Sequence, residues 1–107
     1  MPQANEFKRI ENVQELREIV GKLVQLYYPK ANEYIMGYLK KVELSKRIIE
    51  GKRDIVIHLK NGIRRKGIEY DANTYEMVKK NLPKRVYPKI YIPRVRKREI
   101  RYKLMED

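Results

Sequence analysis

The chain has 107 residues, with 26 lysines and arginines against 14 acidic residues, a formal net charge of +12, and no cysteine. A chain of this length builds one modest core, so we expect a single domain over residues 1–107. The absence of cysteine excludes disulfides, thiolate metal sites and cysteine nucleophiles. No apolar run approaches the roughly 20 residues of a membrane span, and residues 1–12 lack the apolar segment of a signal peptide. We therefore expect an intracellular, cytoplasmic protein without a membrane partner.

The excess of positive charge lies in the second half of the chain. Residues 1–51 carry 9 basic and 7 acidic side chains, whereas residues 52–107 carry 17 and 7. Such a one-sided excess is the usual electrostatic signature of contact with nucleic-acid phosphates. A composition rich in charge is also typical of thermophile proteins, but thermophily explains abundant charge and not its asymmetry.

Helical periodicity dominates the first half. Asn12, followed three residues later by Glu15, predicts a capped helix that ends at Tyr28-Pro29. Its apolar residues recur at spacings of three and four: Val13, Leu16, Val20, Leu23, Val24 and Tyr27. A second helix is expected from about 29–32 to Glu50, with Gly51 as its stop. The short connection predicts an antiparallel helical hairpin over residues 12–50, which could also contact a second copy or an assembly partner.

Residues 53–71 have the strongest strand pattern. Ile55, Ile57 and Leu59 alternate with more polar neighbours, as in a strand with one buried face. Asn61-Gly62 then predicts a tight two-residue turn, after which a second strand carries three consecutive cations. These cations are Arg64, Arg65 and Lys66.

The remaining segments complete a small sheet. Residues 74–81 fit a two-turn helix capped by Asn73, with Tyr75, Val78 and Leu82 inward, but residues 74–78 would also serve as a strand. Residues 85–92 predict an edge strand because neighbouring prolines cannot donate ladder hydrogen bonds. Ile100, Tyr102 and Leu104 alternate as a closing strand. The predicted fold class is α+β: the helical hairpin packed on an antiparallel sheet of about four strands, with a basic β-rich part over residues 53–104.

The stretch Ile55–Gly67 resembles the first motif of the Sm and Lsm proteins. Leu59-Lys60-Asn61-Gly62 matches that family's turn, Gly67 lies five residues after the first glycine, and Asp71 could stand for its acidic residue. The resemblance covers under a third of the chain. It implies an Sm-like barrel that forms rings and binds RNA, although the family's base-contacting asparagine has no counterpart here.

The sequence contains few residues that could form a catalytic site. His58 is the only histidine, so two-histidine metal sites are excluded. Asp54, Glu69 and Asp71 could hold Mg²⁺ as in a nuclease, but no carboxylate-x-lysine motif follows. No glycine-rich phosphate loop occurs. We expect no catalytic residue, no cofactor and no metal, with a metal-dependent nuclease as the third choice of function.

The sequence contains many more residues that could bind nucleic acid. Cations neutralise phosphates and tyrosine rings stack on unpaired bases. The sequence predicts a non-enzymatic, largely sequence-independent nucleic-acid-binding protein, with RNA slightly favoured over DNA. The alternative is a structural or adaptor subunit of a ribonucleoprotein or virion. The candidate nucleic-acid-binding residues are Arg64, Arg65, Lys66, Tyr87, Tyr91, Arg94, Arg96, Lys97, Arg98, Arg101 and Tyr102.

Overall fold

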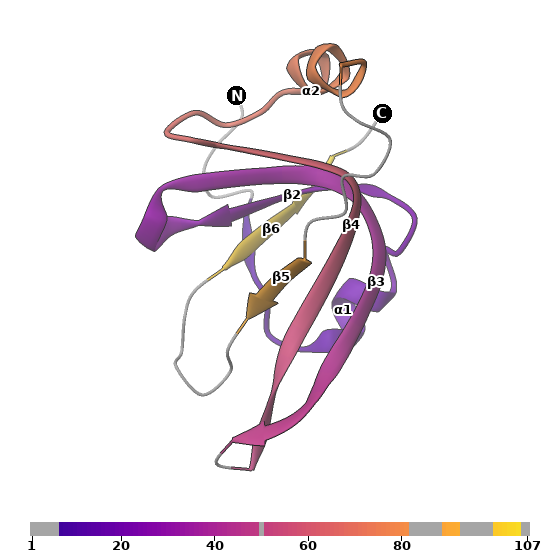
Figure 1. Cartoon of the computed structure of the whole chain (residues 1–107), viewed down its shortest axis with the longest axis vertical. Helices are drawn as coiled ribbons and strands as arrows, with labels where there is room; N and C mark the ends of the chain where they lie inside the picture. Colours follow the sequence, from indigo (N-terminus) through magenta and orange to yellow (C-terminus); the bar gives the residue numbers. More distant parts are fainter. Residues whose placement is uncertain (1–6, 50, 82–88, 93–99, 106–107) are drawn as a thin grey trace.

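The computed structural model describes residues 7–49, 51–81, 89–92 and 100–105. Within these residues, six strands form one antiparallel sheet, bent strongly along its two longest strands, and two short helices flank it (Figure 1). The strands are β1 (Lys8–Arg9), β2 (Leu23–Tyr28), β3 (Glu33–Ile49), β4 (Lys52–Lys66), β5 (Lys89–Ile92) and β6 (Arg101–Leu104). The helices are α1 (Val13–Arg17) and α2 (Ala72–Lys79), and a 3-10 turn spans Pro29–Ala31. The strand order is β1-β6-β2-β3-β4-β5.

The predicted helical hairpin over residues 12–50 is wrong. The predicted N-terminal cap is present, since the Asn12 side chain accepts a hydrogen bond from the Glu15 N–H at 3.0 Å. However, α1 ends at Arg17, and β2 and β3 form a β-hairpin around the 3-10 turn. Both strands are rich in aromatic and branched side chains, which favour a pleated, half-buried surface. A left-handed Asn32, with φ 51°, closes the turn.

The predicted turn at Asn61-Gly62 is also wrong. β4 continues through both residues, because β3 is long enough to pair with it from Lys66 back to Lys52. Asn61 does adopt a positive φ, 53°, but it does so at an irregularity within the ladder. The chain reverses instead at Gly51, which has φ 76° and was expected to stop a helix.

Gly37 and Gly62 allow this irregularity, because β3 and β4 come unusually close there. A Cβ atom on Gly37 would lie 3.0 Å from the Gly62 Cα and 3.1 Å from the Lys60 carbonyl oxygen, both backbone atoms. We expect Gly37→Ala to lower the free energy of unfolding by about 1–3 kcal/mol, measured by urea denaturation. Lys46→Ala, at an exposed position of β3, is the control and should change it by about 0.5 kcal/mol or less. Equal stability of the two variants would contradict the close approach.

Apolar side chains cover both faces of the sheet. The inner cluster includes Ile55, Ile57 and Leu59, at most 2% exposed, so their predicted burial is confirmed. Val13 and Leu16 of α1 pack into the same cluster. A second cluster lies on the outer face beneath α2 (Figure 1), and its buried members are Met36, Ile63, Tyr70 and Tyr75. Because both faces of the sheet are covered, the neighbouring residues Ile35 and Met36 of β3 are both buried, each in a different cluster.

The later elements agree better with the sequence. Residues 72–79 are a helix, with Tyr75 buried as predicted, but its cap is Asp71 and not Asn73. Val78, expected inward, is exposed, and Leu82 lies outside the described residues. β5 is an edge strand, as predicted, whereas the closing strand β6 lies between β1 and β2. No helix in the described part of the chain is long and apolar enough to cross a membrane.

Candidate nucleic-acid interface

Five side chains form a row across the outer face of the sheet. Arg9 pairs with Arg101, Arg101 with Tyr27, Tyr27 with Tyr34, and Tyr34 with Arg65, each as direct register partners. Register partners on antiparallel strands project from the same face. The row therefore crosses β1, β6, β2, β3 and β4, with two tyrosines between arginines. We call these five residues the tyrosine–arginine row.

The two tyrosine rings of the row are stacked. Their centroids lie 4.5 Å apart with an interplanar angle of 21°, and Phe7 contacts both rings edge-on or tilted at about 6 Å. Burial, followed by the charges of Tyr27 and Glu69, raises the pKa of Tyr34. A phenol is neutral at physiological pH even at its ordinary pKa of 10.0, so Tyr34 places no negative charge beside a phosphate.

Arg65 is held firmly at one end of the row. Its Nε donates to the Ile68 carbonyl at 2.9 Å and its Nη2 to the Glu69 carbonyl at 2.7 Å. The guanidinium also lies 4.3 Å from the centroid of the Tyr70 ring. These contacts use only part of the five N–H donors of an arginine, so the group remains able to meet an anion. Its position is fixed in advance, which lowers the entropy cost of binding.

Arg64 and Lys66 project from the opposite face to Arg65. The Arg64 side chain is 73% exposed and its Nε lies 3.6 Å from the Glu33 carboxylate. Lys66 is exposed, and its side chain has no ion pair or hydrogen bond among the described residues. Arg64 also lines a hollow of about 180 Å³ together with Lys89 and Ile100.

The structure describes the other predicted residues to different extents. Tyr102 packs against the inner core and burial raises its pKa, so its ring is away from the row although its neighbour Arg101 belongs to it. Tyr91 lies in β5 opposite Val56, and its side chain is outside the described part. The remaining candidates lie outside the described residues: Tyr87, Arg94, Arg96, Lys97 and Arg98.

Two of the three acidic residues considered for a nuclease, Glu69 and Asp71, have separate structural partners. Glu69 accepts from the Lys103 ammonium, and the Asp71 carboxylate accepts from the Thr74 N–H, which lowers the Asp71 pKa. His58 Nε2 lies 2.6 Å from the Glu43 carboxylate, and this hydrogen bond lowers the Glu43 pKa. Among the described residues, no three histidine, aspartate or glutamate side chains come together as a metal site.

Sequence reasoning missed three of the five residues of the row. Tyr27 and Tyr34 were assigned to helices, and Arg9 was not among the candidate binding residues. The signal that could have found them is the segment from Leu23 to Leu39, in which two β-forming runs flank Pro-Lys-Ala-Asn. Proline and asparagine between such runs indicate a turn, and hence a β-hairpin with its tyrosines on neighbouring strands.

No protein-family model, curated protein or solved structure matches this chain. Residues Leu59 to Gly62, on which the resemblance to Sm and Lsm proteins depends, lie within β4 and form no turn.

Proposed function

We propose that this protein is a non-enzymatic, largely sequence-independent nucleic-acid-binding protein that favours unpaired strands, RNA over DNA. The observation that supports it is the tyrosine–arginine row. Arg65 and Arg101 come from the two separate basic clusters of the sequence, yet they flank one stacked tyrosine pair. Cations at the two ends of the pair would meet separate phosphates of one strand, while the aromatic pair offers a surface on which any base can stack.

The pairing of acidic side chains adds support. Glu33, Glu69 and Glu76 each have a cation beside them. Local neutralisation can use at most 14 of the 26 basic residues, because only 14 acidic residues are available, and this leaves a net charge of +12. The surplus therefore remains for an external anion. A polyphosphate backbone is the partner that best matches such a surplus, since binding releases its condensed counterions.

The preference for unpaired strands follows from the rings. A stacked base must be accessible on its face, which a duplex does not allow. Contacts to phosphates and ring faces carry no base-edge information, so little sequence preference is expected.

The test is a salt titration of binding to short single-stranded RNA and DNA oligomers. We expect log K to fall with log salt concentration with a slope of several units. Arg101→Gln should reduce that slope by about one unit, because one phosphate contact is lost. Lys46→Gln, a matched loss of charge near the tip of the β3–β4 hairpin, should change the slope less. A flat slope, or binding only to an acidic protein, would favour the adaptor function instead.

A further inference from the structure

A groove lies beside α2, outside the tyrosine–arginine row. Two hollows, of about 440 and 480 Å³, share Gly21 and Tyr38 as lining residues and so adjoin one another. Both volumes fall within the range of about 300–1,000 Å³ that is usual for small-molecule sites. We call this feature the Tyr38 groove. The residues used below are Val20, Gly21, Lys22, Tyr38, Lys60 and Asn61.

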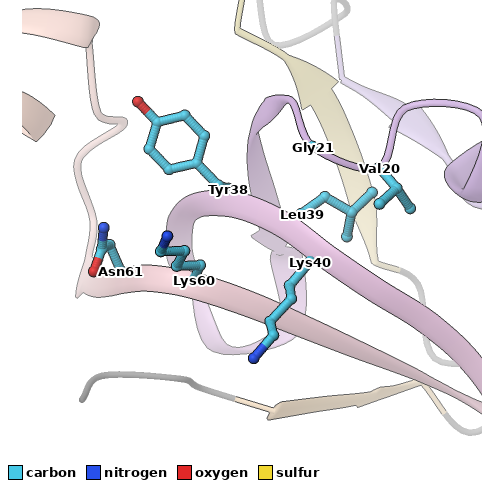
Figure 2. Close-up of a pocket in the computed structure, with 7 residues that line it drawn as sticks. All are labelled: Val20, Gly21, Tyr38, Leu39, Lys40, Lys60 and Asn61. Atoms are coloured by element: carbon cyan, nitrogen blue, oxygen red, sulfur yellow. The ribbon is translucent and has the colours of Figure 1, made fainter. Parts of the chain in front are cut away.

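Tyr38 and Lys60 are direct register partners on β3 and β4, so their side chains leave the ladder side by side. Figure 2 shows both on the same side of the β3–β4 ribbon, with the Asn61 amide next to them, whereas Lys40 extends away from Tyr38. The groove therefore combines an aromatic ring, an ammonium group and a side-chain amide. The amide of Asn61 has no hydrogen-bond partner among the described residues.

The walls of the groove are fixed by backbone hydrogen bonds. The Gly21 N–H donates to the Leu39 carbonyl at 2.7 Å, and the Leu39 N–H donates to the Lys22 carbonyl at 2.9 Å. On the α2 side, the Tyr75 hydroxyl donates to the Asn61 carbonyl at 2.9 Å. Since the walls are held in this way, binding would not require them to be ordered first.

The charge of the groove is positive. Neither Lys22 nor Lys60 has an ion pair or hydrogen bond to another described residue through its side chain. Glu76 is the acidic residue among those lining either hollow, and its carboxylate lies 3.3 Å from Lys79 Nζ. The same Lys79 ammonium lies 5.3 Å from the Tyr38 ring centroid. The site thus suits a ligand that is both anionic and aromatic, and an acidic peptide would use the charge but not the ring.

We propose that the Tyr38 groove binds one unpaired nucleotide. Its base lies against Tyr38 and Val20 with an edge toward the Asn61 amide, and its phosphate meets Lys60. The buried ladder pair Met36 and Ile63 separates this groove from the row, so the two sites are distinct. The inference rests on the proposed function, because it names a second position at which the same strand would be held.

The experiment is an NMR titration of the ¹⁵N-labelled full chain with uridine 5′-monophosphate, and separately with inorganic phosphate. We expect the backbone amide resonances of Val20, Gly21 and Asn61 to shift as the nucleotide is added, and the shifts to saturate. Lys60→Gln should weaken nucleotide binding about tenfold, because a charge-assisted contact is lost. Lys46→Gln, the matched charge control, should leave it unchanged. Inorganic phosphate should bind far more weakly, because it has no ring to stack.

Three results would overturn the inference. The first is an absence of nucleotide-induced shifts at these amides. The second is equal binding of inorganic phosphate, which would make the groove a simple anion site. The third is equal nucleotide affinity of Lys60→Gln and wild type.

A titration with an octamer of uridylate separates this inference from the proposed function. If octamer binding depends on salt and Lys60→Gln leaves it unchanged, the inference about the groove is wrong and the tyrosine–arginine row remains the proposed binding site. Nucleotide binding at the groove without any octamer binding would overturn the proposed function and leave the groove as a mononucleotide site.

Discussion

Replacing Tyr75 by alanine is expected to lower the free energy of unfolding by about 3–5 kcal/mol. The Tyr75 side chain is fully buried and joins α2 to the outer face of the sheet. Its ring meets that of Tyr38 edge-on at 6.2 Å, and its hydroxyl donates to the Asn61 carbonyl. An alanine would leave a cavity beneath a helix that has only two turns and no other fully buried side chain. Urea denaturation followed by circular dichroism measures the loss.

Tyr75→Phe is the matched control, because it keeps the ring and removes only the hydrogen bond. We expect it to cost about 1 kcal/mol. Burial raises the pKa of the Tyr75 phenol above its ordinary value of 10.0, so the folded state keeps the proton that the unfolded state loses. Its contribution is therefore complete below pH 10 and declines as the pH rises further. Tyr75→Phe should reduce this alkaline loss of stability, and an equal cost for both variants would contradict the packing role.

The sequence predicted an element well where its stabilising contacts lie close by in the chain, and poorly where they come from a distant strand. A helix near α2 was one of two predicted possibilities, because its buried tyrosine and the polar residues before it are local signals. β2 was missed because Val20, Leu23, Val24 and Tyr27 also fit a helical spacing, and short apolar runs do not distinguish the two structures. The choice is made by β6, which pairs with Val24 through Leu104, far along the chain. Such a tertiary contact overrides local helical propensity, and the turn residues between β2 and β3 are the local signal that remains.

The candidate site shows the same division. Composition alone indicated a cationic surface, because the excess of charge is a global property. The row depends on register, since Arg65 and Arg101 flank the tyrosine pair only when β6 lies beside β2. Asn61-Gly62 was misread for a related reason. A dipeptide that tolerates positive φ serves equally at a turn and at an irregular point of a ladder, and the length of β3 decides between them.

Gln25→Leu is expected to lower the free energy of unfolding by about 2–4 kcal/mol. Gln25 is fully buried, its Nε2 donates to the Tyr70 carbonyl at 2.9 Å, and its Oε1 accepts from the Tyr70 N–H at 2.8 Å. Leucine has a similar volume but would leave both backbone groups of Tyr70 buried without partners. No buried side-chain nitrogen or oxygen in the described part lacks a partner in the wild type, so this loss would stand out.

Gln25→Leu should also weaken binding at the proposed interface. Tyr70 holds the guanidinium of Arg65, which ends the tyrosine–arginine row. A loosened Tyr70 backbone should therefore speed hydrogen exchange at its amide and weaken oligonucleotide binding together. Gln14→Leu makes the same chemical change at an exposed position of α1 and should leave both nearly unaltered. If the Tyr70 amide exchanges equally fast in both variants, the glutamine does not fix this segment, and Arg65 must be positioned by its own bonds to Ile68 and Glu69.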